Sequence, residues 1–69
     1  MSTDNFYLDM NGKAIETFDN VLVPEPNDTD LHEHEFSGMV DGFRQGNVIV
    51  VDGDGDCFEI ESERLEVEF

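Results

Sequence analysis

Apolar and polar residues alternate along much of this 69-residue chain with a period of two. That period is typical of β-strands, whose successive side chains point to opposite faces. Residues 6–10 and 13–17 alternate around Asn11-Gly12, so the pattern predicts a hairpin with a type I′ turn. A strand is predicted over residues 21–23, and it ends at Pro24 because proline has no N–H to donate to a ladder.

The same alternation continues after a polar loop at residues 25–30. Phe36, Gly38 and Val40 share one side of a predicted strand, and Phe43 follows them. Gly46-Asn47 and the stretch 52–56 are expected to form turns. Further strands are expected over residues 48–51, 57–61 and 65–69, with a single helical turn at 62–64. The best helical candidate, residues 28–36, lacks apolar residues at helical spacing, so a helix is disfavoured there.

Short strands separated by polar turns predict an all-β fold, a small barrel of about five strands. The barrel is expected to carry an N-terminal strand or hairpin and one short helical turn before the last strand. A chain this short buries only about 60% of its unfolded-state surface. We therefore expect one domain, residues 1–69, in which 1–19 form an N-terminal hairpin or extension and 20–69 form the barrel.

Residues 20–69 resemble SH3-like small barrels of the Tudor or KOW kind. The resemblance lies in "FSGMVDGF", in "NVIVVDGDGD" and in "ESERLEV", which follows the pattern of a helical turn before a final strand. It implies a stand-alone bacterial protein and says little about function, since this fold hosts many kinds of binder. The chain has no Trp and one Tyr, so the aromatic groove of a peptide-binding SH3 domain is not expected. Phe36, Phe43 and Phe58 could form a Tudor-type cage, but core packing is the favoured role.

Charge narrows the choice of partner. The chain has 18 acidic and three basic residues, a formal net charge of −15, and the acids are spread along its whole length. Such a surface repels nucleic acids and anionic lipids, whose binding needs Lys and Arg. A basic protein partner is therefore expected, with no direct nucleic-acid or membrane binding. No targeting or membrane-spanning segment is recognised, which favours the cytoplasm, and the oligomeric state stays open.

The stretch "VVDGDGDCFEIESE" invites comparison with an EF-hand calcium loop. Asp52, Asp54 and Asp56 fit the first three ligand positions of such a loop, and Glu63 fits the last. The position that needs glycine for the sharp turn is Cys57, and the flanking residues have the pattern of strands. A hairpin turn is therefore the favoured interpretation, with weak calcium binding as an alternative.

Other candidate sites are weaker. His32 and His34 would point the same way on a strand and could share a metal ion, although no third ligand is evident. The alternative is that Glu33 and Glu35 make this segment pH-sensitive. Cys57 has no basic residue near it in the sequence, and the neighbouring aspartates disfavour a thiolate, so it is expected to be a small core residue and not a nucleophile. Arg64 is expected to pair with nearby glutamates. Neither catalysis nor a cofactor is expected.

These observations favour a non-enzymatic interaction module that binds a basic protein. The expected binding surface combines the long polar loop with the aspartate turn, because in SH3-like barrels these two elements often lie close together. Its residues are Glu25, Asp28, Asp30, Glu33, Glu35, Asp52, Asp54 and Asp56. Two alternatives stay open: a nucleic-acid mimic that occupies the basic site of a DNA-binding protein, and a weak divalent-metal-binding protein through His32 and His34 or the aspartate turn.

Overall fold

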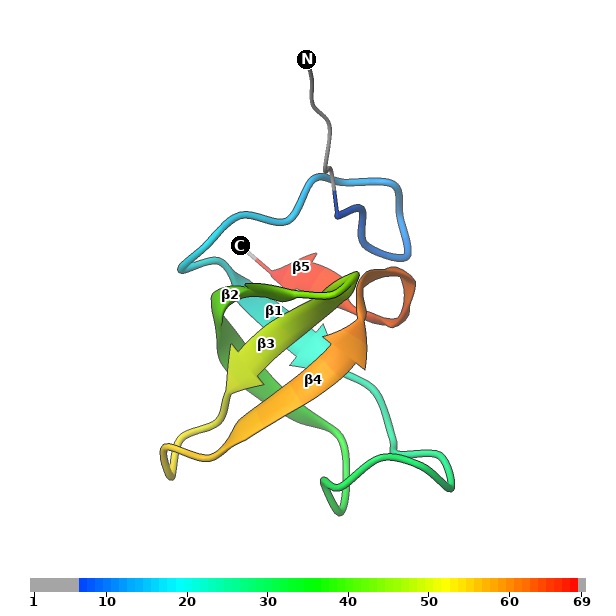
Figure 1. Ribbon diagram of the computed structural model, residues 1–69, viewed down its shortest axis with the longest axis vertical. Helices are drawn as coiled ribbons and strands as arrows, with labels where there is room; N and C mark the ends of the chain where they lie inside the picture. Colours follow the sequence, from blue (N-terminus) through cyan, green and yellow to red (C-terminus); the bar gives the residue numbers. More distant parts are fainter. Residues whose placement is uncertain (1–6, 69) are drawn as a thin grey trace.

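Five antiparallel strands form one curved sheet in the computed structural model, which describes residues 7–68 (Figure 1). The strands lie in the order β4-β3-β2-β1-β5. Their bounds are β1 Asn20–Val23, β2 Phe36–Arg44, β3 Asn47–Val51, β4 Cys57–Glu61 and β5 Glu66–Glu68. A 3-10 turn, η1 (Ser62–Arg64), connects β4 to β5. The all-β prediction, including the helical turn before the last strand, is confirmed. The arrangement is compatible with an SH3-like fold.

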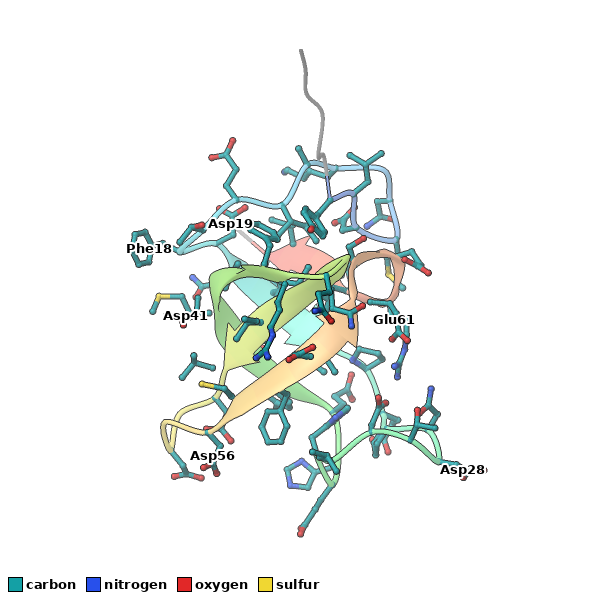
Figure 2. All side chains as sticks on the ribbon, in the orientation of Figure 1. Phe18, Asp19, Asp28, Asp41, Asp56 and Glu61 are labelled. Carbon is teal, nitrogen blue, oxygen red and sulfur yellow. The ribbon has the colours of Figure 1, made fainter. Side chains whose placement is uncertain are left out.

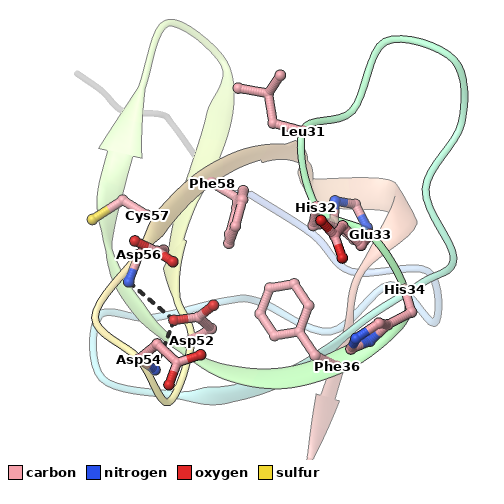
Figure 3. Close-up of a pocket in the computed structure, with 10 residues that line it drawn as sticks. All are labelled: Leu31, His32, Glu33, His34, Phe36, Asp52, Asp54, Asp56, Cys57 and Phe58. Carbon is pink, nitrogen blue, oxygen red and sulfur yellow. Dashed lines mark hydrogen bonds between the residues drawn. The ribbon is translucent and has the colours of Figure 1, made fainter.

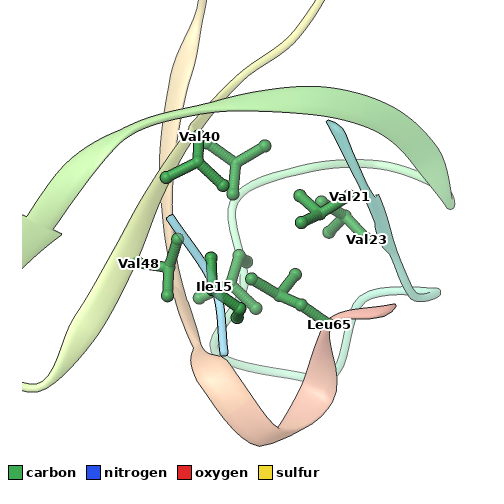
Figure 4. Close-up of a cluster of buried hydrophobic side chains, with 8 residues drawn as sticks. Ile15, Val21, Val23, Val40, Val48 and Leu65 are labelled. Atoms are coloured by element: carbon green, nitrogen blue, oxygen red, sulfur yellow. The ribbon is translucent and has the colours of Figure 1, made fainter. Parts of the chain in front are cut away.

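The concave face of the sheet holds the core. Alternate residues of β3 point inward, so Val48 and Val50 are fully buried while their neighbours are half-exposed. β-Branched side chains fit this position because they pack well on a pleated surface. Figure 4 shows the cluster, in which every strand except β5 contributes a buried residue. Its members are Ile15, Val21, Val23, Val40, Val48, Val50, Ile60 and Leu65.

A β-bulge in β2 explains why the residues that point inward do not alternate strictly along this strand. Val40 pairs with Val50, and Gly42 pairs with Ile49, so Asp41 is the extra residue in β2. Because one extra residue reverses the alternation, Phe43 faces inward opposite Val48, although it is three positions from Val40. The sequence placed these side chains on one strand but gave no sign of the bulge.

Two turns differ in detail from their predictions. The turn between β2 and β3 consists of Gln45 and Gly46, one residue earlier than expected, and both have positive φ (50° and 87°). Positive φ at both central residues is the type I′ pattern. At Asn11-Gly12, only Gly12 has positive φ (80°), and its N–H donates to the carbonyl of Asp9. The predicted type I′ turn there is therefore wrong.

The N-terminal hairpin is reduced to a single β-bridge, between Leu8 and Ala14. Phe6 of the predicted hairpin lies outside the described residues. Ile15 nevertheless belongs to the core, where its side chain is 5% exposed. Figure 1 shows this segment across the end of the sheet beside β5 and η1. The segment therefore completes the hydrophobic core of the sheet.

The sheet has two edges, β4 and β5, which are not paired with each other in the described ladder. Within the described residues, hydrogen bonds between edge strands therefore do not close the sheet into a barrel. The 7–15 segment covers β5: Met10 N–H donates to Leu65 O (2.8 Å), and Val67 N–H donates to Asp9 Oδ2 (2.9 Å). Proteins often cover edges in this way to prevent unwanted strand pairing.

Candidate functional site

A groove lies between the long β1–β2 loop and the β3–β4 hairpin, which meet at the same end of the molecule (Figures 1 and 3). Its volume is about 540 Å³. Among the described residues that line it, none is Lys or Arg. The lining residues are Leu31, His32, Glu33, His34, Phe36, Asp52, Asp54, Asp56, Cys57 and Phe58.

One wall of the groove is the aspartate turn, which forms a hairpin between β3 and β4 as predicted. Asp52 Oδ1 accepts hydrogen bonds from the N–H groups of Asp54 (2.9 Å) and Asp56 (3.0 Å), as Figure 3 shows. Gly55 supplies the positive φ (89°) that the turn needs. The carboxylate of Asp52 therefore organises its own loop, while those of Asp54 and Asp56 are exposed.

The floor of the groove contains three rings in mutual contact. His32, Phe36 and Phe58 have ring centroids 5.6 to 5.8 Å apart, at tilted or edge-on angles. Phe36 and Phe58 also pack against the core, in agreement with the favoured role. Phe43 lies elsewhere and stacks on Tyr7 at 4.5 Å. Because the three rings fill the space between them, they offer an apolar surface and leave no room for a cation enclosed by rings.

The two histidines have different environments, contrary to the prediction that they share one side of a strand. The segment 31–35 is a loop, in which His32 is 6% exposed and His34 is exposed. His32 Nε2 donates to the carbonyl of Pro24 (2.8 Å), and its buried Nδ1 has no hydrogen-bond partner among residues 7–68. In residues 7–68, no three His, Cys, Asp or Glu side chains are grouped so that they could hold a metal ion.

Asp30 forms an ion pair with Arg64, whose Nη2 lies 2.6 Å from Asp30 Oδ2. Arg64 also donates to Glu61 Oε1 at 3.0 Å, which agrees with the expected glutamate pairing. The hydrogen bond from Arg64 lowers the pKa of Asp30 to about 2, against the opposing effect of burial. The same two carboxylates raise the pKa of Arg64 above its ordinary value. Asp30 thus ties the long loop to η1, and its side chain is only 7% exposed.

The remaining acidic residues expected at a binding surface are distributed along the loop. Glu33 lines the groove with the hairpin acids. Glu25 and Glu35 lie near each other, since the Glu35 N–H is 3.5 Å from Glu25 Oε2. Asp28 is exposed at the far end of the loop and is not among the residues that line the groove (Figure 2).

Two apolar or weakly polar groups at the groove, Leu31 and Cys57, were not predicted as site residues. Leu31 is 87% exposed, so its isobutyl group stands in solvent at the rim. Cys57 is exposed, and the prediction of a core cysteine is wrong, because the inward positions of β4 belong to Phe58 and Ile60. The alternation of residues 57–61 in the sequence contained this signal. No local pattern in the sequence indicates that Leu31 is exposed.

Negative charge surrounds the molecule and is not confined to the groove. Figure 2 shows the labelled carboxylates of Asp19, Asp41, Asp56 and Glu61 on different sides of the sheet. The described residues contain no helix long and apolar enough to cross a membrane. Comparison of the chain with protein-family models, curated proteins and solved structures finds no match.

Proposed function

We propose that this protein is a non-enzymatic interaction module that binds a basic segment of a partner protein in the groove between the β1–β2 loop and the β3–β4 hairpin. The observation that carries the proposal is the combination of exposed carboxylates with an apolar floor. Asp54, Asp56 and Glu33 surround the contact between Phe36 and Phe58. A Lys or Arg side chain matches both parts, because its charged end pairs with carboxylates while its methylene stem packs on apolar surface.

The apolar floor also favours a protein over the other candidate partners. A nucleic-acid mimic needs carboxylates arranged like phosphates, and rings beside them add nothing to that likeness. Asp30 is left out of the proposed surface because Arg64 already pairs with it. Glu25, Glu35 and Asp28 extend the negative potential along the loop and would speed the approach of a basic partner.

Charge reversal at the groove tests the proposal. The probe is a fluorescent twelve-residue peptide rich in Lys and Arg, and binding is followed by anisotropy at about 0.15 M salt, where long-range attraction is screened. The groove variant is Asp54→Lys/Asp56→Lys. The control variant, Glu16→Lys/Asp41→Lys, changes the net charge equally at exposed positions outside the groove.

We expect the groove variant to bind at least about tenfold more weakly than the native protein, and the control variant to lose less than about threefold, because only close pairs escape screening. Equal losses in the two variants would show that attraction is a property of net charge, and the groove would no longer be a site. Circular dichroism of each variant checks that the sheet is intact.

A further inference from the structure

The two edges of the sheet differ in how their backbone groups are used. At the β5 edge, the 7–15 segment accepts a hydrogen bond from Val67 N–H through Asp9, and its Met10 N–H donates to the carbonyl of Leu65, just before β5. On β4, no such segment is present within the described residues. One edge of the sheet is therefore covered and the other is open.

The hydrogen-bond pattern identifies which groups of β4 are open. Asp52 N–H donates to Asp56 O, which makes this pair the hydrogen-bonded position next to the turn of the hairpin. Because such pairs alternate along an antiparallel ladder, Phe58 and Ile60 direct their N–H and C=O groups toward β3, while Cys57 and Glu59 direct theirs away. In the described part of the chain these outward groups have no hydrogen-bond partner. Glu61 differs, since its N–H bonds to its own carboxylate.

The open edge adjoins the proposed binding groove. Leu31, Cys57 and Phe58 line both the main groove and a second crevice of about 250 Å³ that follows β4. An extended segment placed antiparallel along β4 would point alternate side chains at Phe58, on the side of the groove acids Glu33, Asp54 and Asp56, and the others to the opposite face. Lys or Arg fits the first set of positions, because its stem packs on Phe58 and its charged end pairs with the groove carboxylates, and Val fits the second, where its main-chain groups meet those of Cys57 and Glu59.

We infer that the basic partner binds as an added β-strand on β4, with main-chain hydrogen bonds to Cys57 and Glu59 and with basic side chains at alternate positions. This inference rests on the proposed function and specifies its recognition mode, in which backbone bonds supply affinity and alternate side chains supply specificity. A second copy of this chain does not fit the edge, because its own β4 strand, Cys57–Glu61, carries no Lys or Arg to meet the groove carboxylates.

A pair of peptides tests the inference. The first is an acetylated heptapeptide in which Lys and Val alternate, and the second has the same sequence with N-methylated valines, so it keeps the charge and loses main-chain donors. We expect the first peptide to bind saturably and to slow hydrogen exchange at the amides of Cys57 and Glu59 by at least about tenfold. The second is expected to bind at least about tenfold more weakly, since each buried main-chain bond lost costs about 1 kcal/mol or more.

A protein variant gives a second, independent measurement. Glu59→Pro removes one outward N–H, whereas the control Glu59→Gln removes the charge and keeps that N–H. Because the Glu59 N–H points away from β3, the proline leaves the β3–β4 ladder intact. We expect the proline variant to lose affinity for the first peptide about tenfold relative to the glutamine variant.

The outcomes separate the two proposals. If both peptides bind equally and Asp54→Lys/Asp56→Lys weakens both, the acidic groove stands and strand addition is overturned. If neither peptide binds, both proposals fall. If the amides of Cys57 and Glu59 are protected without peptide and sedimentation shows a concentration-dependent dimer, a second copy occupies the edge and the inferred occupant is wrong.

Discussion

Single aspartates organise the turns of this chain by accepting hydrogen bonds from backbone N–H groups. Asp9 and Asp52 play the same part in two different turns, where one carboxylate oxygen accepts from the residues two and four positions later. Asp9 differs in being 4% exposed and in using its second oxygen to accept from Val67. Burial raises the pKa of Asp9, but the three backbone donors outweigh it, so the pKa lies below its ordinary value.

The two aspartates provide a matched pair of mutations. Asp9→Asn places an amide NH₂ where an acceptor is needed, because both oxygens of Asp9 accept from N–H groups. We expect a loss of about 2–3 kcal/mol in the free energy of unfolding. Asp52→Asn is expected to cost less than about 1 kcal/mol, since one oxygen suffices there and the amide can point to water. Urea denaturation measures both, and equal losses would contradict this account.

Because Asp30 is ionised when it pairs with Arg64, we expect the stability of the fold to depend on pH. The pKa of Asp30 is about 2 in the folded protein and 3.8 as the ordinary value. A depressed pKa means that the pair stabilises the fold above about pH 4 and that this contribution is lost as the pH falls toward 2. Asp30→Asn should therefore be less stable than the native protein at pH 7, by about 1–2 kcal/mol.

The informative quantity is the difference in the free energy of unfolding between the native protein and Asp30→Asn, and not the absolute stability of either protein. Acid also removes repulsion among the other carboxylates, and this effect is nearly common to both proteins. Thermal melts from pH 7 to pH 2 should show a constant gap down to about pH 4.5 and a shrinking gap below it. A gap of the same size at pH 2 and pH 7 would exclude the proposed contribution of the ion pair.

Among the elements, β2 contains a glycine, Gly38, whose Cα faces closely packed atoms of β3. A Cβ at Gly38 would lie 2.6 Å from Val50 Cγ1 and 2.7 Å from Val51 O. The second of these is a backbone atom, so a side chain at this position requires a shift of the strand itself. Gly42, farther along β2, has no atom within 4 Å of the corresponding Cβ.

Replacing these two glycines by alanine tests how tightly β2 packs. Gly38→Ala is expected to lower the free energy of unfolding by about 1–3 kcal/mol, the usual cost of overpacking. Gly42→Ala is expected to change it by less than about 1 kcal/mol, because its Cβ meets open space. The measurement is urea denaturation of both variants. A Gly38→Ala protein as stable as Gly42→Ala would show that the strand shifts at no cost.

Elements with local signals were predictable from the sequence, and long-range contacts were not. The 57–61 strand and the 62–64 turn follow from alternation and from a short polar segment, and both have the predicted bounds. The bulge at Asp41 leaves no local mark, because any polar residue fits an exposed extra position. Arg64 was expected to pair only with neighbouring glutamates, and its contact with Asp30, 34 residues away, depends on how the loop folds back. The groove followed from the expected barrel, but its apolar floor did not.

At the scale of the whole molecule, the net charge of −15 opposes the compact fold. The described ion pairs neutralise little of it: Arg64 pairs with Asp30 and Glu61, and Arg44 pairs with Glu59 at 3.6 Å in an exposed position. Unfolding moves the carboxylates apart, so repulsion favours the unfolded chain. The stability of the protein is therefore expected to depend on ionic strength.

Added salt should stabilise the folded protein. Raising NaCl from about 0.01 M to about 0.5 M shortens the Debye length from about 30 Å to a few ångströms, which screens most of the repulsion. We expect the melting temperature to rise by about 5–10 °C, which corresponds to about 1–2 kcal/mol for a domain of this size. Scanning calorimetry measures the change, and a melting temperature independent of salt would contradict it.

The hydrogen bond from Val67 N–H to Asp9 also determines when, during synthesis, the turn at Asp9 can dock on β5. Fifty-eight residues separate its two partners, and the turn at Asp9 leaves the ribosome long before β5 does. During synthesis the carboxylate of Asp9 therefore stays hydrated, and the β5 edge receives its cover only after Val67 has emerged. Contacts between such distant positions form late because closing a long loop costs entropy first. Docking of this turn is thus a final step of folding, and nascent chains halted before Val67 lack it.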